Sequence, residues 1–238
     1  MVGNWSRIKY TIIKGEVFMK KILRSLLSSV TATVLAVASL SVTSAFASYE
    51  DHIFSNFPCY QQMAGSTDCW AQSIRAMYKY EYNTSISIEA VIGTYVMLVR
   101  AGTGNTTYNY SSTSVYGAIP IYVYQTFAYY FPSYDVSYYV GVLTQNEIIS
   151  QYSNDLMALV IFRSDISPTS WIYHVCAFAG YRSGATSSNV QRVYYMNPTT
   201  GQIERGSYYA NSYIYLRDND VVNAYNYYWY ETMKTDIS

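Results

Sequence analysis

The first half of the chain carries hydrophobic residues at helical spacing. Such a pattern runs over 70–78, directly after Ser66-Thr67-Asp68, residue types that cap helices. It recurs over 88–99, opened by Ser87. Residues 101–113 are polar and predict a loop. These patterns predict two amphipathic helices, with a polar loop after the second.

The stretch 114–130 favours a third helix, with Pro120 near its start or at a kink, and a strand around IYVY is the alternative. Thr144 and Glu147 form a capping box that opens a short helix through Tyr152.

The second half reads mainly as strands. LMALVIF is a continuous apolar run, as a fully buried strand requires, and SGATSSN (183–189) is a hairpin-type connection. The predicted strands are 156–162, 171–181, 190–196 and 212–216. Helices first and strands afterwards predict an α+β fold, with an N-terminal helical part packed on a C-terminal antiparallel sheet.

Composition fits one globular domain and excludes two other classes of protein. Among 238 residues, 18% are aromatic, which is too much buriable surface for a disordered chain. Fifteen Lys and Arg are balanced by 15 Asp and Glu, so the net charge is zero and nucleic acid is not an expected partner. No metal-ligand cluster or phosphate-binding loop is evident, and we expect no cofactor.

The N-terminal region reads as a secretion signal. Lys20, Lys21 and Arg24 precede an apolar stretch diluted with Ser and Thr, and Ala45-Phe46-Ala47 is a small-x-small cleavage site. An uncleaved membrane anchor is the weaker alternative. Residues 1–18 do not fit a signal peptide, so we expect translation to start at Met19. The expected organisation is an upstream mis-start over 1–18, a signal peptide over 19–47 and a secreted domain over 48–238, without a membrane partner after cleavage.

The three cysteines and two histidines are few enough to consider one by one. An odd number of cysteines in an exported protein leaves at least one thiol unpaired. Cys69 stands at a predicted helix start, where the helix dipole and free N–H groups stabilise a thiolate. His52 lies just beyond the cleavage site, in a segment that we expect to be mobile. His174 lies inside an apolar strand and is the better candidate base.

A third group is needed to orient the imidazole. Asn197 opens the turn after the next strand, in MNPTTG, and could lie beside His174. Its alternative role is that of a turn-forming residue before Pro198.

The segment FPCYQQMAGSTDCWAQSIRAMYKY resembles the entry motif of bacterial papain-like cysteine peptidases, in the branch similar to the double-glycine leader peptidases. In that family a strand rich in Pro and aromatic residues ends in Gln, and a loop leads to Cys-Trp at a helix head. YHVCAFAGYR resembles the family's histidine strand, and YYMNPTTG its following strand and turn. The resemblance covers most of 57–202 and implies a papain-like fold, with the active site in a cleft between helices and sheet.

The resemblance implies hydrolysis of peptide bonds through a thioester. Cys69 would be the nucleophile, His174 its acid and base, and Asn197 the residue that orients the imidazole. Gln62 would donate to the oxyanion together with the Cys69 N–H. Two departures stand out: Gln62 precedes the cysteine by seven residues where six are usual, and Asn197 replaces the Asp common in the bacterial branch.

Neighbouring residues have more than one interpretation. We interpret Asp68 as the helix N-cap rather than a catalyst. Trp70 packs beneath the site or serves as plain core. Cys59 and Cys176 are either two buried free thiols or a disulfide. The 30 tyrosines have two interpretations: they bury their rings while their hydroxyls remain in contact with water, or they form an aromatic surface that binds peptide or glycan.

Two rival functions remain open. One is a peptidoglycan-cleaving Cys-His endopeptidase, although its cysteine-to-histidine interval is usually much shorter. The other is a non-catalytic, Tyr-rich binding module on a papain-like fold. The short segment 48–57 has no room for an inhibitory prodomain, so an active peptidase would need narrow specificity or a separate protein inhibitor. Otherwise the expected partner is a peptide or protein substrate.

Overall fold

The computed structural model describes residues 49–111, 118–167, 170–184, 187–208, 215–216 and 227–237. These belong to one unit that begins at Tyr49. The expected mis-start, signal peptide and cleavage site lie outside the described residues, as do 112–117 and most of the strand expected over 212–216. Within the described part of the chain, no helix is both long and apolar enough to cross a membrane.

Four helices lie in the described part, and local sequence explains where each begins. They are α2 (Cys69–Tyr82), α3 (Ile88–Thr103), α4 (Pro120–Tyr130) and α5 (Gln145–Ser153). The Ser87 hydroxyl accepts from the N–H of Ala90 and caps α3, and Thr144 forms the predicted capping box with Glu147. Pro120 stands in the first turn of α4, where its missing N–H costs nothing.

The strands form one antiparallel sheet in the order β2-β8-β3-β4-β5-β6, with β1 paired to β4 and β7 to β8. They are β1 (Glu50–Ile53), β2 (Asp135–Val140), β3 (Ala158–Ser167), β4 (Ser170–Gly184), β5 (Ser187–Asn197), β6 (Gln202–Ser207), β7 (Tyr215–Leu216) and β8 (Tyr227–Asp236). Beyond the part that pairs with β3, β4 pairs with β1 over residues 180–183. The predicted α+β fold, with N-terminal helices packed against a C-terminal antiparallel sheet, is confirmed.

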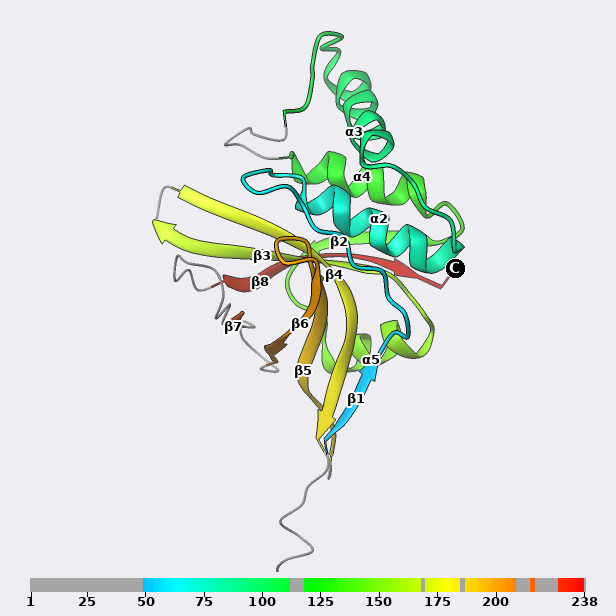
Figure 1. The fold of residues 1–238 in the computed structure, drawn as a ribbon, viewed down its shortest axis with the longest axis vertical. Coiled ribbons are helices and arrows are strands. Elements are labelled where there is room, and N and C mark those ends of the chain that lie inside the picture. The colour runs from blue at the N-terminus through cyan, green and yellow to red at the C-terminus, as the bar shows by residue number, and fades with distance from the viewer. Residues whose placement is uncertain are drawn as a thin grey trace, which may run out of the picture. The chain divides into compact units, whose positions relative to one another are not determined.

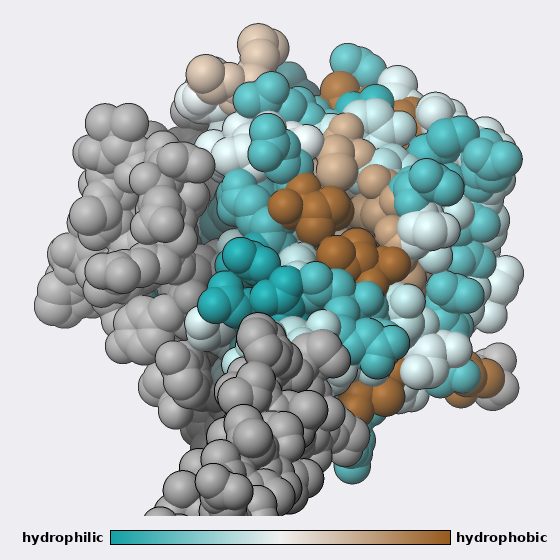
Figure 2. Space-filling view, turned by 60° about the horizontal axis from the view of Figure 1, so that its bottom comes forward, coloured by the Kyte–Doolittle hydropathy of each residue, from teal (hydrophilic) through white to brown (hydrophobic). Residues whose placement is uncertain are grey.

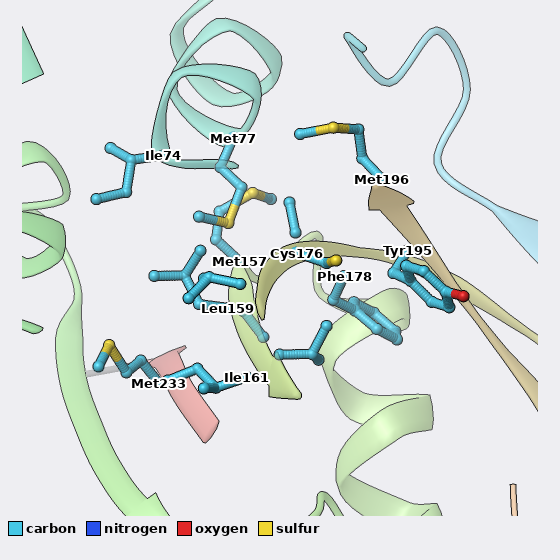
Figure 3. Packing of buried hydrophobic residues seen from close by; sticks show 14 of the residues in the cluster. Ile74, Met77, Met157, Leu159, Ile161, Cys176, Phe178, Tyr195, Met196 and Met233 are labelled. Atoms are coloured by element: carbon cyan, nitrogen blue, oxygen red, sulfur yellow. The ribbon is translucent and has the colours of Figure 1, made fainter. Parts of the chain in front are cut away.

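Helices α2, α3 and α4 gather on one side of the sheet, and α2 lies next to it (Figure 1). Ile74 and Met77 of α2 are fully buried and face Met157, which directly precedes β3, and Cys176 on β4 (Figure 3). The Ser73 hydroxyl donates to the carbonyl of Val175 at 3.1 Å inside this contact. Burial of this helix face therefore fixes the start of α2 against β4.

Several local predictions need correction. The segment around His52, expected to be mobile, forms β1 instead, because its backbone pairs with β4. Helix α3 extends through Thr103 into the expected polar loop. By contrast, the favoured helix after Pro120 is confirmed over Pro120–Tyr130, and the alternative strand around IYVY does not form. Strands β2, β6 and β8 were not predicted. Residues 114–117 of the third expected helix lie outside the described residues.

Tyrosine rings contribute to the core while their hydroxyls bond to protein atoms. Tyr95 is fully buried, and its hydroxyl accepts from the N–H of Ile119 at 2.7 Å. The hydroxyl of Tyr208 donates to the carbonyl of Leu143 at 2.9 Å. Where Figure 2 is coloured, the surface is mostly hydrophilic, with a small group of hydrophobic residues near the centre of the view. The burial of these rings favours the core role, and the hydroxyls of Tyr95 and Tyr208 are bonded to protein atoms.

Candidate active site

Cys69 is the first residue of α2, as predicted. The N–H groups of a first helical turn have no acceptor within the helix, so they can stabilise negative charge at this end. Asp68 occupies the N-cap position, and its carbonyl accepts from Ala71 and Gln72. The predicted side-chain cap is absent: Asp68 has φ −94° and ψ 19° rather than extended backbone, and its carboxylate accepts from the Ser66 hydroxyl.

His174 lies on β4 and joins Cys69 to Asn197. Its Nε2 lies 2.7 Å from Oδ1 of Asn197, and its side chain is also hydrogen-bonded to Cys69. Because Nε2 faces the amide, Nδ1 is the ring nitrogen left for the thiol. A neutral amide oxygen can only accept, so Nε2 carries a proton in this arrangement. The three residues that sequence spacing singled out are therefore in one hydrogen-bonded line.

A backbone donor completes the surroundings of the sulfur. The N–H of Val175 points to Sγ of Cys69 at 3.5 Å. Only 7% of Cys69 is exposed, and His174 is partly buried. The sulfur is therefore contacted by a backbone donor of β4 as well as by the imidazole.

Electrostatics at His174 favour the imidazolium. Burial by itself lowers the pKa of His174. Hydrogen bonds to Cys69 and Asn197, together with the negative charges of Cys69 and Glu204, outweigh burial and bring the pKa above its ordinary value. The arrangement can therefore hold a thiolate beside a protonated imidazole.

Asn197 ends β5 and is buried, with 3% of its surface exposed. Its Oδ1 also accepts from the N–H of Thr199 at 3.0 Å, and its Nδ2 donates to the carboxylate of Glu204 at 2.8 Å. Asn197 thus makes the contacts that both interpretations expect: it lies beside His174 and it belongs to the turn. Glu204 was missed because β6, the strand that carries it, was not predicted.

Gln62 lies beside the same turn rather than on a regular strand. Its backbone N–H donates to the carbonyl of Pro198 at 2.8 Å. Its side-chain Nε2 donates to the carbonyl of Ser66 at 3.2 Å, while the buried Oε1 has no hydrogen-bond partner. The loop to Cys69 contains a turn closed by Ser66 N–H on the Met63 carbonyl, with Gly65 at φ 76°. The amide donor is engaged by the loop, so the oxyanion role of Gln62 stays a prediction.

An aromatic cluster supports the start of α2. Trp70 is buried against the rings of Tyr95 and Tyr110, at centroid distances of 4.9 and 5.8 Å. The Tyr110 hydroxyl donates to the carbonyl of Thr67 at 2.8 Å and accepts from the indole of Trp70 at 3.3 Å. Trp70 therefore packs beneath the site, and Tyr110 ties it to the loop before Cys69. Tyr110 carried no sequence signal because it stands in a polar stretch.

The three cysteines differ in environment. None of them forms a disulfide, so a Cys59–Cys176 bridge is excluded. Cys176 is fully buried, but Cys59 is exposed, contrary to the expectation of two buried thiols. Of the three, Cys69 is the one whose contact with a histidine the structure describes.

Comparison with known proteins adds no further information: no family model matches the sequence, and no similar curated protein was found. Within the described ranges, no group of three or more His, Cys, Asp or Glu side chains is placed to hold a metal ion. The geometry of the side chains is therefore the basis for any functional assignment.

Proposed function

We propose that this protein is a secreted cysteine peptidase of papain-like architecture. The observation that carries the proposal is the line Cys69–His174–Asn197, in which Nε2 of His174 lies 2.7 Å from Oδ1 of Asn197 and the thiol contacts the same ring. Nucleophile, base and orienting group in this order are what thiol-dependent acyl transfer requires.

The chemistry follows from these positions. The Cys69 thiolate attacks the carbonyl carbon of a peptide, and the electron pair moves to the carbonyl oxygen. The N–H of Cys69 at the helix start stabilises that oxyanion, with Gln62 as the second donor if its amide leaves the Ser66 carbonyl. Protonated His174 gives its proton to the departing amine, leaving a thioester on Cys69. Water, deprotonated by His174, then hydrolyses the thioester and restores the thiol.

The first experiment measures alkylation of Cys69 by iodoacetamide against pH in protein expressed from the full sequence, with labelled peptides located by mass spectrometry. Cys59 is exposed and free, and burial raises the pKa of its thiol, so it is an internal reference. We expect Cys69 to label rapidly at about pH 6 in the wild type and slowly in His174→Ala, whereas Cys59 labels slowly at that pH in both and gains rate only in alkaline solution. Labelling of Cys69 no faster than Cys59 at pH 6 contradicts the catalytic proposal and favours the binding module.

The substrate class needs a separate measurement. Wild-type protein and a Cys69→Ala control are incubated with denatured casein and with purified cell wall. We expect Cys69-dependent cleavage of casein. Cleavage of cell wall alone would identify the peptidoglycan endopeptidase instead.

A further inference from the structure

The carboxylate of Glu204 lies behind Asn197, and the proposed mechanism leaves it unused. Glu204 is on β6, diagonal to Asn197 in the β5–β6 ladder, where Asn197 pairs with Gln202 and Tyr195 with Glu204. Its Oε2 accepts from Nδ2 of Asn197 at 2.8 Å, and its Oε1 accepts from the hydroxyl of Thr200 at 2.6 Å. Both carboxylate oxygens are thus engaged at the turn that presents Asn197.

An ionised carboxylate can only accept hydrogen bonds, so it can pair only with the NH₂ end of the Asn197 amide. With Nδ2 held by Glu204, Oδ1 must face the opposite way, toward His174. The N–H of Thr199 donates to the same Oδ1 and selects the same orientation. A rotated amide would place NH₂ against the protonated Nε2 and would lose three hydrogen bonds.

We propose that Glu204 is a positioning residue of this site, on the basis of the proposed function. Its carboxylate fixes the Asn197 amide with Oδ1 toward His174 and places a negative charge behind Asn197, two hydrogen bonds away from the imidazolium. The residue next to the histidine is a neutral Asn, and Glu204 supplies, through Asn197, the negative charge that an Asp at position 197 would have supplied directly.

The groups around His174 are consistent with this assignment. Among the described residues, ionisable groups that act on the ring include the Cys69 thiol from α2 and Glu204 from β6, and the charge of Glu204 raises the pKa of His174. From β5 the neighbour is the uncharged Asn197, and on β3 the residue paired with His174 is Phe162. Glu204 is therefore a fixed negative charge that favours the imidazolium when the thiol is neutral.

The test is an NMR titration of the imidazoles in histidine-labelled full-length protein. The chain contains two histidines, so His52 is an internal reference. In Glu204→Gln the side chain still accepts from Asn197 but has no charge. We expect the His174 titration to move to lower pH and Cys69 alkylation near neutral pH to fall several-fold, while the His52 titration stays in place. Glu89→Gln removes the same charge from the exposed start of α3 and should change neither histidine.

The double variant Asn197→Asp/Glu204→Gln moves the charge to the position next to the ring. The amide introduced at position 204 can donate to the carboxylate introduced at position 197, so the contact is kept while the charge is transposed. We expect the His174 titration to return to wild-type pH or above it. An unchanged His174 titration in Glu204→Gln, or no recovery in the double variant, overturns the assignment. If wild-type Cys69 is not reactive, the proposed function fails, while the titration still reports separately on Glu204.

Discussion

The two histidines of this chain lie in contrasting surroundings. His174 is bonded on both sides, to a thiol and to an amide whose far end meets a carboxylate. His52, on β1, is held by rings: it stacks on Tyr181 at 4.5 Å between centroids and meets Tyr152 edge-on at 5.6 Å. Its polar neighbours are the Ser183 hydroxyl at 3.3 Å and the Glu50 carboxylate at 3.8 Å. The comparison shows that polar contact alone does not make a histidine a candidate base: His174 contacts a thiol and an orienting amide, whereas the described polar neighbours of His52 include no nucleophilic thiol and its ring is packed between tyrosines.

Replacement of each histidine by alanine is the strongest test of this contrast. His174→Ala should reduce Cys69-dependent casein hydrolysis by about 10²–10⁴-fold, because the proton acceptor and donor is lost. His52→Ala should keep the activity, since the described contacts of His52 include no thiol. The rates are compared after thermal unfolding shows that both variants are folded. Equal losses in the two variants would mean that the difference in surroundings has no catalytic meaning.

Two adjacent glutamines provide the next test. Both contact the 197–201 turn: Gln62 through its backbone N–H, and Gln61 through Nε2 on the Thr199 carbonyl at 3.1 Å. If Gln62 leaves the Ser66 carbonyl to bind the oxyanion, Gln62→Ala should lower kcat by about 10²–10³-fold with little change in KM. Gln61→Ala, at an exposed position, is the matched control and should stay close to wild type. Similar kinetics for the two variants would remove Gln62 from the oxyanion site.

The sequence was informative where a short local signal decides the structure. The spacing of apolar residues predicted α2, the capping box predicted α5, and the buried run at 156–162 predicted β3. The candidate site could be predicted to the same extent, because Cys69 at a helix start and Asn197 at a strand end are both local features. Their distance to His174 is not local, and it depends on the packing of α2 on β4.

The predictions missed the elements whose stability comes from pairing. β1 is a short, polar strand that exists because β4 extends beyond its pairing with β3 and offers free backbone groups at 180–183. β6, which carries Glu204, forms only through its hairpin with β5. No single residue in the sequence predicts the register of that hairpin. Tyr110 likewise reaches Thr67 and Trp70 across a long sequence separation. Such contacts follow from tertiary structure and leave no pattern in one sequence.

Removal of one tyrosine hydroxyl should affect stability more near the candidate site than near His52. Tyr110→Phe leaves the Thr67 carbonyl and the Trp70 indole N–H without this partner, at a cost of about 1–3 kcal/mol in the free energy of unfolding. Tyr181→Phe, next to His52, keeps the stacked ring, and no hydrogen bond of the Tyr181 hydroxyl occurs among the described contacts, so we expect a change below about 0.5 kcal/mol. Denaturant unfolding measures both. An equal cost would show that the aromatic stack also depends on polar contacts.

The smallest expected effect concerns the ion pair beside His52. The guanidinium of Arg182 donates to both carboxylate oxygens of Asp51, and these hydrogen bonds lower the pKa of Asp51 from 3.8 to about 2. A lowered pKa means that the folded state favours the charged carboxylate, so its contribution to stability is present above about pH 4 and is lost as pH falls through about 2. Because the pair is partly exposed, Asp51→Asn should cost no more than about 1 kcal/mol at neutral pH.

Urea unfolding of wild type and variant at descending pH should therefore show two curves that converge as Asp51 is protonated. A difference that stays undiminished as pH falls to about 2 would mean that Asp51 acts through its hydrogen bond with Tyr194 rather than through its charge.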